Sequence, residues 1–203
     1  MKKNIITYVL LVVITFLAGW LRFYNITNNP PSLNIDEVSF GYSAYSIMKT
    51  ARDEYGSFMP LTFRSTGDNK NPIPVYLMVP SIYFFGLNEF GVRFPTALLG
   101  TLSIPALFFL LRQLFRRYDI ALIGAFLMAI SAWHIHFSRY AYDPLVSSFF
   151  LIVGIIFFLK LFEGKVKYGI ISSIFLVLAM YSAFTERLFV PAFVFLSLLI
   201  NYK

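Results

Sequence analysis

The sequence predicts an all-α polytopic membrane protein with about six transmembrane helices and two interfacial helices in a large first outer loop. Three observations predict this class. Hydrophobic residues make up 58% of the 203 residues and charged residues only 13%, whereas soluble domains carry about 25% charged residues. The apolar residues form long runs with the polar residues gathered between them. The basic residues are concentrated on one side of these runs, as the positive-inside rule expects.

Six apolar runs are expected to cross the membrane. The first, Ile5–Phe23, has 19 residues, enough to span a hydrocarbon core of about 30 Å at about 1.5 Å per residue. It ends in Gly-Trp-Leu-Arg, which does not resemble the cleavage site of a signal peptide. Because the last run has only 13 residues, we expect a single domain over residues 1–203 that is truncated at its C-terminus. The later runs are Phe94–Leu111, Ile120–Ile135, Leu145–Phe162, Tyr168–Phe184 and Leu188–Ile200.

Residues 24–93 form the predicted outer loop and contain two helical patterns. Apolar residues at helical spacing predict a helix over Asp36–Lys49, and Asn34 is a suitable N-cap. A second helix is expected to follow Pro72 and to end at Phe85, just before a glycine. Both are short for a transmembrane helix, so we expect them to lie at the outer surface of the membrane.

The net charge of +7 is explained by topology. With the N-terminus in the cytoplasm, the basic excess falls on the inner side and the outer side is neutral, which indicates a multi-pass protein of the plasma (inner) membrane rather than a nucleic-acid-binding protein. The chain has no cysteine, which excludes thiol chemistry, and two histidines do not make a usual zinc site. The inner charged residues are Lys2, Lys3, Arg112, Arg116, Arg117, Lys160, Lys165, Lys167 and Lys203, with Asp119 and Glu163.

The adjacent carboxylates Asp36 and Glu37 are the strongest candidates for catalytic residues in the sequence. They open the first predicted outer helix, where the helix dipole keeps carboxylates ionised. An ionised carboxylate at a membrane surface can accept a proton from a hydroxyl group or hold that group in place. Since neighbouring helical residues point in different directions, we assign Asp36 as the catalytic base and Glu37 as its support. The alternative is ordinary acidic capping of a surface helix.

Outer basic residues at helix ends are the expected partners of a lipid phosphate. Lys or Arg at the headgroup level suits a phosphate, and Arg can bind two of its oxygens at once. The alternative is a set of anchors whose charged ends reach the headgroups. Asp143, followed by Pro144, also has a complete explanation as a helix start. The predicted substrate-binding residues are Lys70, Arg93, Asp143, Arg139 and Arg187.

Several stretches, taken in order, carry a family resemblance. Asp-Glu opens the first outer helix, Lys-Asn-Pro-x-Pro begins the second, and Phe-Gly-Leu-Asn-Glu-Phe-Gly-Val-Arg-Phe-Pro-Thr-Ala-Leu enters the next span. The segment Ser131–Arg139 with Asp143, and Tyr181 with Arg187–Pro191, add to the pattern. Together they resemble the GT-C membrane glycosyltransferases, in particular the protein O-mannosyltransferase and aminoarabinose transferase group.

The resemblance implies an inverting transfer of sugar from a polyprenyl-phosphate donor to a protein, lipid or glycan acceptor on the non-cytoplasmic side. Asp36 would activate or orient the acceptor, and Lys70, Arg93 and Arg187 would stabilise the leaving phosphate. No cofactor is expected. Relatives commonly have His or Glu where this chain has Asn71, so the sequence gives no support for a divalent metal. The alternative is a non-enzymatic transporter or lipid flippase, which would place ionisable residues in mid-span rather than at helix ends.

Overall fold

The computed structural model describes residues 2–65, 68–164 and 166–201. Lys165 and Lys203, two of the predicted inner basic residues, lie outside this part of the chain. The elements follow one another as α1 Lys2–Phe23, α2 Ile35–Thr50, β1 Phe63–Ser65, β2 Asp68–Lys70, α3 Pro72–Phe85, α4 Glu89–Phe115, α5 Tyr118–Ile130, α6 Ala132–Ser138, α7 Asp143–Phe162, α8 Lys167–Met180 and α9 Glu186–Asn201.

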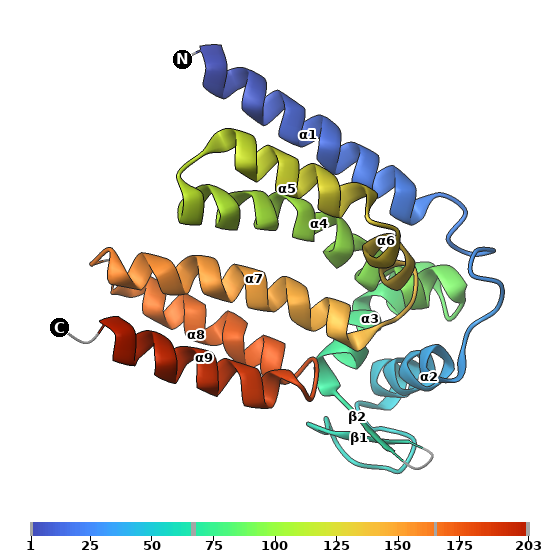
Figure 1. Ribbon diagram of the computed structural model, residues 1–203. Helices are drawn as coiled ribbons and strands as arrows, with labels where there is room; N and C mark the ends of the chain where they lie inside the picture. Colours follow the sequence, from blue (N-terminus) through green and yellow to red (C-terminus); the bar gives the residue numbers. More distant parts are fainter. Residues whose placement is uncertain (1, 66–67, 165, 202–203) are drawn as a thin grey trace.

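The long helices form two groups that run side by side (Figure 1). One group contains α1, α4 and α5, and the other contains α7, α8 and α9, with α4 packed against α7 between them. The shorter elements α2, α3, α6 and the β-hairpin gather at one end of both groups. Buried apolar residues of α2, β1, α3 and α4 form a common core at this end. The predicted outer loop is therefore a packed layer over the ends of the long helices.

Local signals set the helix starts at this end. The side chain of Asn34 accepts a hydrogen bond from the backbone N–H of Glu37, and the Glu37 carboxylate accepts one from the backbone N–H of Asn34, which makes a complete capping box for α2. Asn88 caps α4 in a similar way, through the N–H of Gly91. Prolines occupy the first turns of α3 and α7. The helices predicted over Asp36–Lys49 and from Pro72 to Phe85 are confirmed as α2 and α3, and their place at the outer surface stays a prediction.

Membrane-spanning length is clear for three of the described helices. Ile5–Phe23 of α1, α4 and α7 are long and apolar enough to cross a bilayer, and α5 with α6 would make a fourth span if the bent pair is counted as one. The apolar helix α8 has only 14 residues and ends at Met180, short of the predicted Phe184. The helical membrane class is thus confirmed, and the total of six spans stays a prediction.

The predicted span Ile120–Ile135 is interrupted and is divided between α5 and α6. The chain bends by 59° between α5 and α6. At the break, Ser131 has an extended backbone and its side chain accepts a hydrogen bond from the N–H of His134, which starts a new helix. Arg22 of α1 donates to the carbonyl oxygens of Met128 and Ala129 at the end of α5. These contacts satisfy backbone groups that a continuous helix would otherwise pair.

Two further differences from the predicted elements affect the position of charged residues. Helix α4 begins at Glu89 rather than at Phe94, so Arg93 lies inside its first turns. A short antiparallel hairpin, which the sequence pattern did not indicate, pairs Phe63 with Lys70. Phe63 is buried in the core against α2 and α3. Because Lys70 lies opposite this anchored residue, the hairpin holds Lys70 beside α2.

Candidate active site

A cavity of about 450 Å³ lies at the end of the molecule where α2, β2 and α7 meet. Its charged lining residues are Asp36 from the first turn of α2, Lys70 from the end of β2 and Asp143 from the start of α7. Its aromatic lining includes Phe40, His136, Phe137, Tyr140, Tyr142 and Phe184. Three of the predicted site residues, from distant parts of the sequence, therefore share one hollow with aromatic walls.

Asp36 and Lys70 form an ion pair across this cavity. The Asp36 side chain is 61% exposed, whereas the Lys70 side chain is only 15% exposed. The Lys70 ammonium also lies over the ring of Phe40, 5.8 Å from its centroid. The carboxylate is thus open to an incoming molecule, and the ammonium is held against the protein wall behind it.

Asp143 is joined to Arg187 through Asn71. The amide nitrogen of Asn71 donates to Asp143 Oδ2 at 3.2 Å, and Arg187 Nη2 donates to Asn71 Oδ1 at 3.1 Å. Asn71 is only 1% exposed, and the Arg187 guanidinium lies over the ring of Phe184 at 4.5 Å. Arg187 is therefore connected to the cavity but does not line it, and Asn71, which the sequence did not single out as a site residue, is the link.

Replacing Asn71 with Ala is expected to lower the free energy of unfolding by about 1–3 kcal/mol, because the buried Asn71 amide is the shared hydrogen-bond partner of the partly buried Asp143 carboxylate and of Arg187. The measurement is unfolding of the purified protein in detergent. Asn28→Ala is the control, since Asn28 is exposed and bonds only within its own turn; its effect should stay within about 0.5 kcal/mol. Equal stability of the two variants would show that the link contributes nothing.

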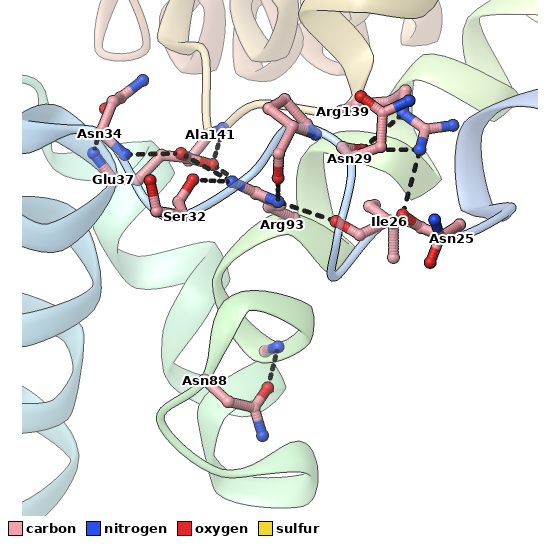
Figure 2. Close-up of polar contacts among 12 residues, drawn as sticks. Asn25, Ile26, Asn29, Ser32, Asn34, Glu37, Asn88, Arg93, Arg139 and Ala141 are labelled. Atoms are coloured by element: carbon pink, nitrogen blue, oxygen red, sulfur yellow. Dashed lines mark hydrogen bonds and ion pairs between the residues drawn. The ribbon is translucent and has the colours of Figure 1, made fainter.

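Glu37 and Arg93 form a fully buried ion pair behind the cavity (Figure 2). Arg93 Nε donates to Glu37 Oε1 at 2.8 Å, and Nη2 donates to Oε2 at 3.2 Å. The remaining N–H groups donate to the carbonyl oxygens of Ile26, Pro30 and Ser32 at 2.8, 2.8 and 2.6 Å. A guanidinium has five N–H donors, so Arg93 has none left for a phosphate.

Arg139 has a similar environment in the linker between α6 and α7 (Figure 2). It donates to the carbonyl oxygens of Asn29, Tyr24, Asn25 and Leu21 at distances between 2.6 and 3.3 Å. Burial, and then the positive charge of Arg93, lower the pKa of Arg139 below its ordinary value, although an arginine stays charged at neutral pH. Arg139 therefore also binds the α1–α2 connection.

The structure thus divides the predicted site residues into two sets. Asp36, Lys70 and Asp143 line the cavity, and Arg187 contacts it through Asn71. Glu37, Arg93 and Arg139 lie in the protein interior and fix the α1–α2 connection. The expected placement of Arg93 and Arg139 at lipid headgroups is corrected here, because the carbonyl groups of a non-helical connection need donors and these two arginines supply them.

A second buried network is centred on Arg22, and the sequence analysis did not predict it. Arg22 is fully buried and donates to Ser138 Oγ at 3.2 Å, while its Nη2 lies 2.8 Å from His134 Nδ1. An arginine near the end of an apolar run is itself a signal, because charge in such a position needs partners. Within the described ranges, no group of three His, Asp or Glu side chains is placed to hold a metal ion.

Comparison with known proteins identifies the family. The model of the dolichyl-phosphate-mannose-protein mannosyltransferase family matches residues 12–200. The chain belongs to this family. The predicted resemblance to GT-C glycosyltransferases is therefore confirmed, and this mannosyltransferase-family chain is a multi-pass membrane protein.

One relative of the chain is an uncharacterized protein, so the match to it does not refine the assignment of function. The chain is 28% identical over 160 residues to this protein, which comes from Aquifex aeolicus (strain VF5). The match covers 78% of the present chain and 30% of the relative, so the chain spans less than a third of that protein's length. No solved structure matches the chain.

Proposed function

We propose that this chain forms the active-site part of a glycosyltransferase that moves a sugar from a polyprenyl-phosphate donor to an acceptor hydroxyl, with inversion. The observation that carries the proposal is the cavity that Asp36, Lys70 and Asp143 line together with several aromatic side chains. Family membership supports a lipid-linked sugar as the donor. If the protein lies in the plasma membrane with its N-terminus in the cytoplasm, α1 crosses the membrane once and the cavity lies on the non-cytoplasmic side.

In the proposed reaction, the acceptor hydroxyl oxygen attacks the anomeric carbon on the face opposite the phosphate. The new glycosidic C–O bond forms as the bond from that carbon to the phosphate oxygen breaks, and the electron pair departs with polyprenyl phosphate. The hydroxyl proton passes to the Asp36 carboxylate, whose side chain is 61% exposed. A single displacement inverts the anomeric centre, and it requires no cofactor.

Lys70 would stabilise the negative charge that grows on the departing phosphate. Without donor, its ammonium pairs with Asp36. A donor phosphate in the cavity offers Lys70 a second anion, so the carboxylate is released toward the acceptor as the donor binds. Asp143, held by Asn71, would accept a hydrogen bond from a sugar hydroxyl, and aromatic residues such as Tyr140 would pack on the sugar face.

The test is transfer of radiolabelled sugar from polyprenyl phosphate by the full-length protein in proteoliposomes. Wild-type protein is expected to form a labelled glycosidic product, and Lys70→Gln is expected to reduce the rate about 100-fold, the effect of losing one donor to a developing oxyanion. Lys49→Gln is the matched control, because Lys49 is exposed at the far end of α2 and does not line the cavity.

Two results would contradict the proposal. One is an undiminished rate for Lys70→Gln. The other is movement of labelled donor between the leaflets without any glycosidic product, which would identify a transporter or lipid flippase instead.

A further inference from the structure

A second and larger hollow lies between α4 and α7, far from the candidate active site. Its volume is about 770 Å³, and it is lined by residues of α4 from Leu102 onward and of α7 from Phe149 onward, together with Arg116 and Glu163, which directly follow these helices. Helix α7 begins at the active-site cavity with Asp143 and ends at Phe162. At about 1.5 Å per residue, the far end of this helix is about 30 Å from the active site. The groove therefore opens at the opposite end of the long helices.

The inner part of the groove is apolar. Phe109 and Leu102 of α4 face Phe149 and Val153 of α7 across it. From Arg112 to Leu102 the wall runs for about 15 Å along α4. Phe109 is 47% exposed, although it belongs to a helix with the length and composition of a membrane span. In a bilayer such a surface is covered by hydrocarbon.

The mouth of the groove is positively charged. Arg112 comes from the last turn of α4, Arg116 is the residue that caps the end of that helix, and Lys160 comes from the last turn of α7. The Arg112 guanidinium lies over the ring of Tyr118 at 4.1 Å, and the Lys160 ammonium lies 5.1 Å from the centroids of both Phe157 and Tyr168. These aromatic contacts hold Arg112 and Lys160 at the edge of the groove without neutralising them.

The cations at the mouth lack anionic partners in the part of the chain that the structure describes. No salt bridge there involves Arg112, Arg116 or Lys160. The Nε atom of Arg112 is buried and has no hydrogen-bond acceptor among the described residues. Glu163 is the acidic residue of the lining, and the C-terminal ends of α4 and α7 add only partial negative charge. The mouth thus has an excess of positive charge next to the apolar inner part of the groove.

We propose that this groove binds an anionic glycerophospholipid. One acyl chain lies along the apolar walls of α4 and α7, and the headgroup phosphate contacts Arg112, Arg116 and Lys160. Charge complementarity selects this occupant over a neutral lipid, because the guanidinium and ammonium groups that line the mouth can donate charge-assisted hydrogen bonds to phosphate oxygens. The inference does not rest on the proposed glycosyltransferase reaction, because the two sites lie at opposite ends of the helices.

The experiment is native mass spectrometry of the full-length protein in detergent, titrated with dioleoyl phosphatidylglycerol or with dioleoyl phosphatidylcholine. Wild-type protein is expected to retain phosphatidylglycerol preferentially. The combined change Arg112→Gln, Arg116→Gln and Lys160→Gln is expected to weaken this binding by about fivefold for each cation removed. Val153→Phe, which fills part of the apolar groove without a change of charge, should also weaken the binding of phosphatidylglycerol.

Arg117→Gln with Lys167→Gln is the control, since these residues belong to the same membrane face but do not line the groove. Equal retention of the two lipids by wild-type protein would overturn the proposal, as would full binding by the triple variant. A loss in the control as large as in the triple variant would also overturn it, because it would assign the effect to general surface charge. So would tight binding of polyprenyl phosphate that phosphatidylglycerol does not displace.

Discussion

Replacing Arg93 with Met is expected to lower the free energy of unfolding by about 3–5 kcal/mol, the usual effect of removing one partner from a buried ion pair. The change leaves the Glu37 carboxylate without its counter-ion in a site from which solvent is excluded. It also removes the donors that bind the carbonyl oxygens of Ile26, Pro30 and Ser32. The measurement is chemical or thermal unfolding of the purified protein in detergent.

A double-mutant cycle separates the ion pair from the backbone contacts. Glu37→Gln in the Arg93→Met background should cost less than Glu37→Gln alone, because the uncompensated carboxylate has then been removed. Arg64→Met is the control, since Arg64 is exposed on β1. If Arg93→Met were no more destabilising than Arg64→Met, the buried pair would not be what fixes the α1–α2 connection.

Replacing Asp36 with Asn is expected to reduce the rate of sugar transfer by about 10²–10⁴-fold, the range for loss of a general base. Stability should change little, because the Asp36 side chain is 61% exposed and α2 keeps its cap through Asn34 and Glu37. The measurements are product formation from a labelled polyprenyl-phosphate sugar and, in parallel, the unfolding temperature.

Glu54→Gln is the matched control for Asp36→Asn, because Glu54 is an exposed carboxylate of the same outer segment that does not line the cavity. A normal unfolding temperature with a much lower rate would assign Asp36 to the chemical step. A rate equal to that of Glu54→Gln would remove Asp36 from the proposed mechanism and leave its pairing with Lys70 as a surface contact.

Much of the fold could be predicted from the sequence, because its signals are local. Asn34, Pro72 and the long apolar runs define where helices start and which of them reach membrane length. The break at Ser131 and the hairpin that carries Lys70 were not predictable in this way. Both depend on contacts between distant segments, such as Arg22 with the end of α5 and Phe63 with the core.

The candidate site was predictable to a similar degree. The concentration of opposite charges at one end of the helices follows from the order of the spans, and the structure gathers Asp36, Lys70 and Asp143 there. The sequence did not reveal that Arg93 and Arg139 turn inward. Their direction is decided by the carbonyl groups of a connection without regular structure, and such groups leave no pattern in the sequence.

The two inward arginines have a mechanical consequence. Between them they bind backbone oxygens from Leu21 to Ser32, nearly the whole path from α1 to α2. A path held in this way cannot serve as a hinge. Because Arg93 belongs to α4 and Arg139 to the linker between α6 and α7, the start of α2 with Asp36 is braced against both of these elements.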